Sequence, residues 1–342
     1  MIAGSALAAV PAFATDSGAP ASGVVQGFDV SNYQAAAPDF TLAVKNGAKF
    51  VLVKAGDAES LTKPGYSASA YFAAQWAAAG TADLIRGAYV VAGPGNGKKA
   101  ADPKAEADAF AKQVAALLDQ PRTLPPIVDL ERGATTTCWM ATDAVWARNL
   151  AANQRTMVAW LRAFSAEVRA KVGRLPLIYT NTDWWSMCTG GSSSFRANGL
   201  FLAAYGVAKP AVPKGWATYA FWQWRATASG AKGFPGDPDV FHGSGSALNQ
   251  LAKPFLKAGP VPVVHGIRRV GQTLSAAVGS WPSGTTLTYQ WYASGKAIPH
   301  ATGAKLKLAG ALRGAKIAVR VTGTKPGFVH ADRWSTTTAK IA

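Results

Sequence analysis

Residues 24–224 alternate short apolar runs with amphipathic stretches, and this alternation restricts the fold more than any other feature of the sequence. Strands are predicted at 24–30, 50–54, 85–92, 126–131 and 177–181, and helices at 39–46, 67–79, 103–119 and 142–173. Two further strands are predicted at 200–205 and 220–224, with little helix between them. Alternating strands and helices build parallel sheets. We therefore predict an α/β fold, an irregular (β/α) barrel with helices missing in its last part.

Local signals set the ends of the longer helices. Asp102 followed by Pro103 is an N-cap with proline at the first helical position. Thr142 is the expected N-cap of the long helix that ends at Gly173, and Gly80 is the expected stop of the helix at 67–79.

Composition changes after Pro254, and Pro260-Val261-Pro262 then forms a stiff joint. Beyond it, short β-branched runs separated by turn residues lie at 272–278, 287–292, 305–308, 315–322 and 336–341. This pattern predicts a small all-β sandwich at 263–342, joined by a linker at 255–262 to a barrel domain at 24–254. Trp291 is its expected core residue.

Residues 1–23 are interpreted as the remnant of a signal peptide followed by a linker. The first fourteen residues are small and apolar, and they end in Ala12-Phe13-Ala14, which fits a signal-peptidase site. A basic start is missing, so the alternatives are a truncated secretion signal, which we favour, and an apolar arm. A secreted protein, extracellular or associated with the cell wall, is expected. No apolar run approaches the length of a membrane span.

The chain has two cysteines, Cys138 and Cys188, and each follows a predicted strand by a few residues. Loops after neighbouring parallel strands emerge on one face of the sheet, and export favours oxidation. A disulfide is predicted; the alternative is two buried thiols.

The formal net charge is +17, and the last quarter of the chain carries a large share of it. From residue 261 onward there are eleven basic residues: Arg268, Arg269, Lys296, Lys305, Lys307, Arg313, Lys316, Arg320, Lys325, Arg333 and Lys340. Asp332 is the one acid there. Such a module attracts polyanions. For an exported protein an anionic cell-wall polymer is the favoured partner over nucleic acid, for which the sequence has no recognisable motif.

Asp129-Leu130-Glu131 ends an apolar run in two carboxylates that share one face of a strand. Two acids beyond a buried parallel strand suit hydrolysis of a glycosidic bond. A strand end with solvated acids and a metal-binding pair are the alternatives for this motif alone. Asp29 and Asp237 lie at or after other predicted strands, so several carboxylates are expected to converge on one mouth.

In eight ordered blocks the sequence resembles the glycoside hydrolase family 25 lysozymes, over about 26–243. The blocks are GFDVSNYQ at 27–34, FVLVKA at 50–55, RGAY at 86–89, DLE at 129–131, LIYTN at 177–181, AYG at 204–206, WQ at 222–223 and DPDVF at 237–241. The resemblance implies an irregular β/α barrel and an N-acetylmuramidase that cuts the glycan strands of peptidoglycan.

By position, the resemblance makes Glu131 the general acid/base and Asp129 the carboxylate that steers the substrate's acetamide group. Asp29 and Asp237 match the flanking acids. A competing interpretation makes Asp129 a covalent nucleophile. Asp57 stands where relatives usually have Glu, and Asp239 replaces a common Asn.

Aromatic and polar residues near the strand ends are candidates for sugar contacts, although core packing is the commoner role of a barrel aromatic. The candidates for substrate binding are Tyr33, Lys54, Tyr89, Tyr179, Tyr205, Trp222 and Gln223, with Trp184 as a further ring. We expect no cofactor, no metal and no nucleic-acid partner, and a monomer.

The last module resembles the immunoglobulin-like domains of exported actinobacterial proteins, through VGQTL at 270–274, LTYQW at 287–291 and IAVRVTG at 317–323. The sequence therefore predicts a secreted peptidoglycan hydrolase; a catalytically inactive wall-binding protein is the alternative.

Overall fold

The computed structural model describes residues 20, 24–36, 38–58, 65–95, 100–133, 137–226 and 233–342. The predicted leader and linker at 1–23 lie outside the described residues, apart from Pro20. The chain divides into two compact units, one formed by Met1–Leu118 with Arg122–Ala252 and the other by Asp119–Pro121 with Lys253–Ala342.

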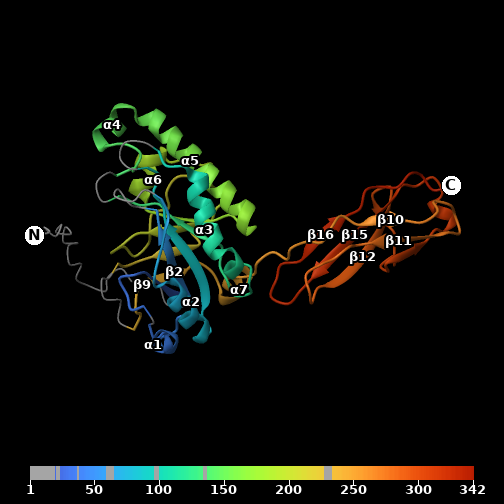
Figure 1. Ribbon diagram of the computed structural model, residues 1–342, viewed down its shortest axis with the longest axis horizontal. Helices are drawn as coiled ribbons and strands as arrows, with labels where there is room; N and C mark the ends of the chain where they lie inside the picture. Colours follow the sequence, from blue (N-terminus) through green and yellow to red (C-terminus); the bar gives the residue numbers. More distant parts are fainter. Residues whose placement is uncertain are drawn as a thin grey trace, which may run out of the picture. The chain divides into compact units, whose positions relative to one another are not determined.

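A closed barrel of eight strands forms the described part of the first unit (Figure 1). Its strands are β1 (Val25–Val30), β2 (Phe50–Asp57), β4 (Ile85–Val91), β5 (Ile127–Asp129), β6 (Leu177–Thr180), β7 (Leu200–Ala203), β8 (Phe221–Gln223) and β9 (Asp237–Phe241). They follow the order β1-β9-β8-β7-β6-β5-β4-β2, and the pairing of β1 with β2 closes the ring. A two-residue strand, β3 (Ser67–Ala68), adds to β2. The predicted barrel is confirmed.

One strand departs from the predicted parallel arrangement. β9 is antiparallel to both of its neighbours, β1 and β8, whereas the other barrel pairs are parallel. Antiparallel strands need no crossover helix, and no helix is seen between β8 and β9 in the residues that are described there. The acidic cluster at the start of β9 is thereby placed at the same end as the last residues of β1.

Helices cover the outside of the barrel, with α3 and α5 lying side by side (Figure 1). The helices are α1 (Thr41–Lys45), α2 (Phe72–Thr81), α3 (Pro103–Leu118), α4 (Asp143–Arg148), α5 (Leu150–Val172), α6 (Thr182–Thr189) and α7 (Gly245–Leu251). Within the described ranges, no helix has the length and apolar character needed to cross a bilayer.

Several helix boundaries differ from the prediction. The helix expected from residue 67 begins at Phe72 and continues past Gly80, since Ser67 and Ala68 pair with β2 instead. The helix expected at 142–173 is broken at Asn149 into α4 and α5. Its two ends are as predicted: the Thr142 side chain accepts the Val145 N–H, and Gly173 is left-handed with φ of 79°. Helices α6 and α7 were not predicted.

Aromatic side chains fill the barrel at the amino ends of its parallel strands. The ring of Phe221 lies 5.1 Å from that of Phe50 and 5.1 Å from that of Phe241. Gly27 faces this cluster, where an added Cβ would meet the Phe50 ring at 2.6 Å. The interior is therefore a packed core, and chemistry is confined to the rim at the carboxyl ends of the parallel strands.

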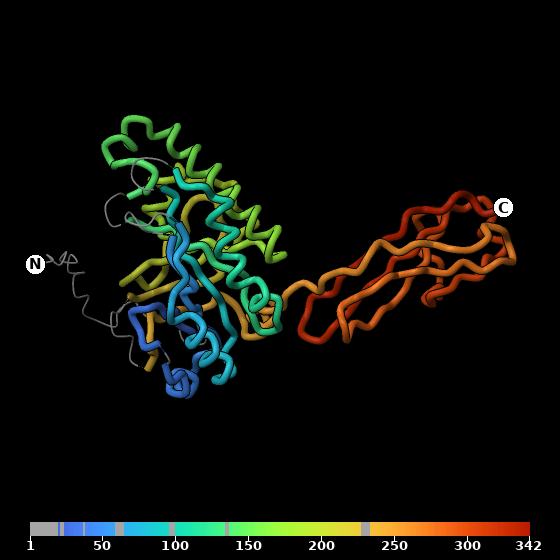
Figure 2. Tube along the Cα trace, in the orientation of Figure 1, coloured from blue at the N-terminus to red at the C-terminus, as the bar shows by residue number. Residues whose placement is uncertain are grey.

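The second unit consists of two antiparallel sheets, traced in orange to red in Figure 2. One sheet holds β10 (Val263–His265), β11 (Thr273–Ala277) and β14 (Lys305–Lys307); the other holds β13 (Lys296–Ala297), β12 (Thr286–Ala293), β15 (Ile317–Thr324) and β16 (Ala331–Trp334), and a 3-10 turn (Gly310–Leu312) follows β14. Trp291 is fully buried in the core of this unit, as predicted, and its Nε1 donates to the Gly303 carbonyl at 2.9 Å.

The strand predicted at 336–341 is wrong, because the last strand is β16 at 331–334. Beyond it the side chains of Ser335 and Thr338 accept the N–H groups of Val319 and Ile317, both at 3.0 Å. The N–H groups of Ser335 and Thr338 also donate to the Val319 and Ile317 carbonyls, at 2.9 and 2.8 Å, so the segment pairs with β15 without forming a regular strand. Phe255 pairs with Val329, so this part of the predicted linker belongs to the second unit.

Candidate active site

Four predicted acids lie at the carboxyl-end rim of the barrel. Asp129 is the last residue of β5, and Glu131 follows it by two. Asp29 of β1 lies directly opposite Asp237 of β9 in the antiparallel pair. The charges of Asp237 and Glu131 both act to raise the pKa of Asp29. The structure therefore brings acids from three strands to one site.

Glu131 is partly buried beside one cation. Burial raises the pKa of its carboxyl, the charge of Lys54 lowers it, and the charges of Asp237 and Asp57 raise it again. The net direction is upward, so Glu131 keeps its proton to higher pH than an exposed glutamate does. A proton held in this way is what a general acid requires.

The predicted disulfide is present in the structure, and one of its cysteines lies in the described part of the loop after β5. Cys138 and Cys188 are bonded, with 5.5 Å between their Cα atoms. Next to Cys138, the Nε1 of Trp139 donates to the Glu131 carbonyl at 2.8 Å. The disulfide thus anchors the segment that holds the backbone of Glu131. Sequence reasoning missed Trp139, and its place beside a cysteine in a short loop was the available signal.

Gln223 connects two tyrosines to an acid. Its Nε2 donates to Asp29 Oδ2 at 2.5 Å, while its Oε1 accepts from the hydroxyls of Tyr179 at 2.8 Å and Tyr205 at 2.5 Å. Burial and the charge of Asp237 hold the pKa of Asp29 well above its usual range, although the Gln223 bond lowers it. Three predicted substrate-binding residues and one predicted acid therefore form one connected network.

Three tyrosines among the predicted contacts differ in exposure. Tyr33 is 76% exposed and Tyr205 is 42% exposed, so both rings are accessible. Tyr89 is partly buried: burial first, then the charges of Asp29 and Asp129 among other acids, raises the pKa of its hydroxyl. A neutral hydroxyl among carboxylates is a hydrogen-bond donor for them or for a sugar oxygen.

The position of Trp222 does not support its predicted contact with substrate. On β8, Phe221 and Gln223 face the barrel interior, so the intervening Trp222 faces outward. It is 2% exposed, and its Nε1 donates to the Ala204 carbonyl at 2.8 Å. Trp184 is also only 2% exposed and donates to the Thr137 carbonyl. Packing, the commoner role of a barrel aromatic, fits both positions.

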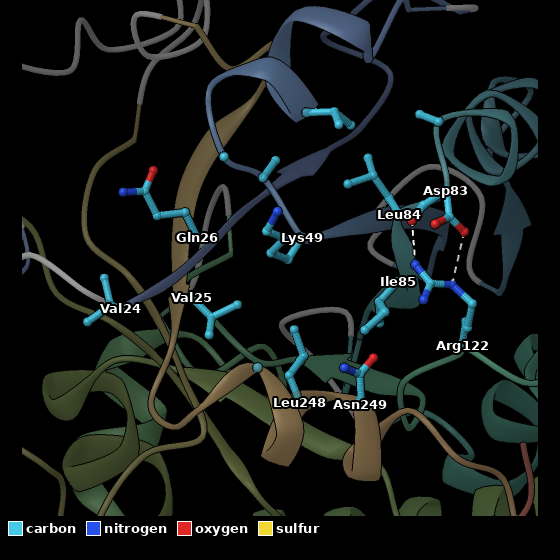
Figure 3. Close-up of a pocket in the computed structure, with 15 residues that line it drawn as sticks. Val24, Val25, Gln26, Lys49, Asp83, Leu84, Ile85, Arg122, Leu248 and Asn249 are labelled. Carbon is cyan, nitrogen blue, oxygen red and sulfur yellow. Dashed lines mark hydrogen bonds and ion pairs between the residues drawn. The ribbon is translucent and has the colours of Figure 1, made fainter.

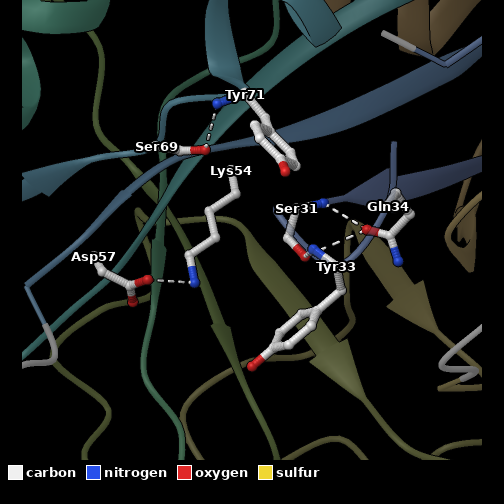
Figure 4. Close-up of polar contacts among 7 residues, drawn as sticks. All are labelled: Ser31, Tyr33, Gln34, Lys54, Asp57, Ser69 and Tyr71. Carbon is white, nitrogen blue, oxygen red and sulfur yellow. Dashed lines mark hydrogen bonds and ion pairs between the residues drawn. The ribbon is translucent and has the colours of Figure 1, made fainter. Parts of the chain in front are cut away.

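Lys54, a predicted substrate-binding residue, lies at the rim in an ion pair (Figure 4). Its partner, Asp57, was not among the predicted site residues. The Lys54 Nζ is 2.6 Å from Asp57 Oδ2. Nearby, the turn after β1 is held by Ser31, whose N–H donates to Gln34 Oε1 at 2.7 Å and whose Oγ accepts the Tyr33 N–H at 3.2 Å (Figure 4). The signal for Asp57 was an acid three residues after a strand lysine.

Asp239 adds a further carboxyl beneath the rim. It shares the inward face of β9 with Asp237 and lies opposite both Gly27 and Gln223. It is 1% exposed, and neither carboxyl oxygen has a hydrogen-bond partner among the described residues. Burial, followed by the charges of Asp29 and Asp237, raises its pKa well above the usual range. Burial therefore favours the neutral form of this carboxyl.

The opposite end of the barrel holds a different cavity (Figure 3). It measures about 490 Å³ and is lined by residues at the starts of β1, β2 and β4, including Val25, Lys49 and Ile85. Its charged pair is Arg122 with Asp83, at 3.2 Å. None of the rim acids lines it, so this cavity is separate from the candidate active site. Among the described residues, no cluster of three or more His, Cys, Asp or Glu side chains could hold a metal ion.

A closed β/α barrel with carboxylates and tyrosines at one rim is the arrangement of a glycoside hydrolase. The family model for glycosyl hydrolases family 25 matches residues 28–232, and the chain belongs to this family. It is a glycoside hydrolase of the lysozyme or muramidase type.

Relatives and solved structures agree with this assignment. The chain is 38% identical over 234 residues to an N,O-diacetylmuramidase of Chalaropsis sp, covering 67% of this chain and 99% of that protein. The bacterial lysozyme of Streptomyces coelicolor matches with a TM-score of 0.58 and 30% identity, over 68% of this chain and 98% of that one. A muramidase of Acremonium alcalophilum matches with a TM-score of 0.56 and 33% identity, over 67% and 98%.

Proposed function

We propose that this protein is a secreted N-acetylmuramidase that cleaves the β-1,4 bond between N-acetylmuramic acid and N-acetylglucosamine in peptidoglycan. The observation that carries the proposal is the raised pKa of Glu131 within a rim of further carboxylates. The names of the family relatives, muramidases and lysozymes, support the same substrate.

In the proposed reaction, protonated Glu131 donates its proton to the glycosidic oxygen as the bond from that oxygen to C1 breaks. The oxygen of the substrate's own acetamide group then bonds to C1, and the Asp129 carboxylate accepts the acetamide N–H. Asp29 and Asp237 supply negative potential for the oxocarbenium-like transition state. Glu131, now ionised, removes a proton from water as the water attacks C1 and the bond from C1 to the acetamide oxygen breaks, which restores the acid, regenerates the acetamide and retains the configuration.

Tyr33, Tyr205 and Lys54 are the proposed substrate contacts, with Tyr89, Tyr179 and Gln223 holding polar groups in place. The exposed tyrosine rings can pack on sugar faces. The Gln223 network fixes the orientation of Asp29 before substrate arrives.

The decisive experiment is mass spectrometry of purified peptidoglycan after digestion. Muramic acid at the new reducing ends is expected. Glu131→Gln should lower the rate at least about 100-fold, the usual contribution of a general acid. Glu167→Gln is the matched control, because Glu167 lies on the outer helix α5 in an ion pair with Lys171. Glucosamine at the reducing ends, or full activity in Glu131→Gln, would refute the proposal. Wall binding by the wild type without turnover would instead identify an inactive wall-binding protein.

A second test separates the two roles of Asp129. If the acetamide is the nucleophile, glycan whose muramic acid lacks the N-acetyl group should not be cleaved. If Asp129 attacks C1 directly, a glycosyl-enzyme adduct on Asp129 should accumulate with a slow substrate. Detection of that adduct would overturn the proposed mechanism and leave the assigned substrate intact.

We also propose that the second unit is the immunoglobulin-like domain expected from the sequence and that it attaches the enzyme to anionic wall material. Its two antiparallel sheets around Trp291 support the first part. Its excess of basic residues supports the second. The domain limits at 24–254 and 263–342 belong to the same proposal.

A further inference from the structure

The outward face of the sheet β13-β12-β15-β16 carries two aromatic rings in contact. On β12 and β15 the side chains of Trp291 and Val319 are buried in the core, so their neighbours Tyr292 and Ala318 face outward. Trp334 of β16 is 47% exposed, and its ring centroid lies 4.6 Å from that of Tyr292 at an angle of 50°. Ala318 lies opposite Tyr292 and is only 8% exposed, because a small residue there lets the rings meet above it.

A cation joins this aromatic pair. Arg320 lies directly opposite Trp334 in the sheet, and its guanidinium carbon is 5.8 Å from the Trp334 ring centroid. Its buried Nε has no hydrogen-bond partner among the described residues. A buried donor without an acceptor is unfavourable, so little holds the guanidinium in place from within the protein. Arg320 as a whole is only partly buried, so an anionic oxygen of a ligand can accept from its other guanidinium nitrogens.

The other sheet of the unit presents a different surface. Lys305 and Lys307 of β14 are exposed on its outward side, because Leu306 between them faces the core. That face attracts anions through charge alone. The face formed by Tyr292, Arg320 and Trp334 combines charge with ring surface, which is the chemistry that recognises an acidic sugar.

We propose that Tyr292, Arg320 and Trp334 form a second glycan-binding site, which takes a peptidoglycan strand. A sugar ring packs against Trp334 and Tyr292, and the lactyl carboxylate of muramic acid accepts hydrogen bonds from Arg320. The choice of occupant rests on the proposed function, since the strand that the barrel cuts carries both the sugar faces and the carboxylates. Charge complementarity with a unit of eleven basic residues and one acid supports it further.

The test measures binding without cleavage. The full chain carrying Glu131→Gln is sedimented with purified peptidoglycan from which phosphate-containing polymers have been removed. Adding Trp334→Ala should raise Kd about tenfold, as expected when an aromatic side chain at the centre of a binding surface is truncated, whereas Trp334→Phe should retain most of the affinity. Arg320→Gln should weaken binding most at low salt, because charge interactions are screened. The matched control is the double variant Lys305→Gln with Lys307→Gln. Its Kd should stay within about twofold of the parent value, because these lysines lie on the other face.

Two outcomes would overturn the site. The first is an equal Kd for the parent and for Trp334→Ala. The second is a loss of affinity in the lysine control as large as that in Trp334→Ala, since charge alone would then explain the binding. Binding that appears only when phosphate-containing polymers are left on the wall would also refute the chosen occupant. Thermal melts of each variant confirm that the second unit is folded.

Cleavage assays separate this site from the proposed function. With Glu131 intact, Trp334→Ala should cut short soluble peptidoglycan fragments at the wild-type rate but act more slowly on insoluble walls. If the wild type cuts neither substrate, the proposed function fails, while the sedimentation result still tests the glycan site.

Discussion

Replacing Glu106 by Gln is expected to stabilise the first unit at neutral pH. Glu106 lies in the first turn of α3, is 7% exposed, and accepts the Gly93 N–H through Oε1 at 3.1 Å. Burial raises the pKa of the Glu106 carboxyl from 4.5 to about 8, although the hydrogen bond from Gly93 lowers it. Glutamine keeps the acceptor oxygen and the shape but carries no ionisable group.

The sign follows from proton linkage. The folded state holds the Glu106 proton up to about pH 8, whereas the unfolded state releases it near 4.5. Stability is therefore undiminished below about pH 4.5 and falls as the pH rises toward 8. From these two values the carboxyl costs about 3 kcal/mol at pH 7. Glu106→Gln removes this cost, which corresponds to roughly 10 °C in melting temperature for a domain of this size.

Calorimetry of the full-length protein at pH 4 and pH 7 measures the effect. The melting temperatures of wild type and Glu106→Gln should agree at pH 4 and separate at pH 7. Asp108→Asn is the matched control on the same helix: Asp108 pairs with Lys171 at 2.8 Å and Lys112 at 2.9 Å, and their hydrogen bonds lower its pKa to about 2. That variant should lose stability at pH 7. An equal rise in melting temperature for Glu106→Gln at pH 4 and pH 7 would refute the proposed role of the Glu106 charge.

Three further predictions concern the rim and its supports. Lys54→Met removes the cation that lowers the pKa of Glu131, so the alkaline limb of the pH–rate profile should move to higher pH; a downward shift would contradict this. Asp239→Asn removes a buried carboxyl whose pKa is raised, so it should raise the melting temperature more at pH 8 than at pH 4, and an equal gain would argue against a neutral carboxyl. Cys138→Ser with Cys188→Ser opens a loop of separation 50 and should lower the free energy of unfolding by about 4 kcal/mol in denaturant titrations; no change would exclude the chain-entropy account.

Local patterns predicted much of the barrel because they are complete within short segments. The Thr142 cap and the left-handed Gly173 are determined by a few neighbouring residues, and both ends of that helical stretch were predicted. The break at Asn149 was not predicted, since the helical pattern continues on both sides of it. The segment predicted as a strand at 336–341 is not a regular strand: Ser335 and Thr338 bond to β15 through side chains as well as backbone, which residue propensities do not report.

The face on which a residue lies depended on tertiary pairing. Trp222 and Gln223 are adjacent in a strand of three residues, too short for an alternation to be read from the sequence. Pairing with β7 and β9 turns Gln223 inward to Asp29 and Trp222 outward. The antiparallel direction of β9, which places Asp237 opposite Asp29, likewise had no local signal.

The sequence by itself determined the family, the alternation of strands and helices, and the carboxylates at strand ends, because each of these is encoded in residue order along the chain. Only the tertiary structure decided the protonation of the site. The pKa of Glu131 depends on burial and on charges from Lys54, Asp57 and Asp237, all of which are distant from Glu131 along the chain. The aromatic pair of Tyr292 and Trp334 likewise exists only through sheet pairing, because Coulomb interactions and ring contacts depend on distance in space.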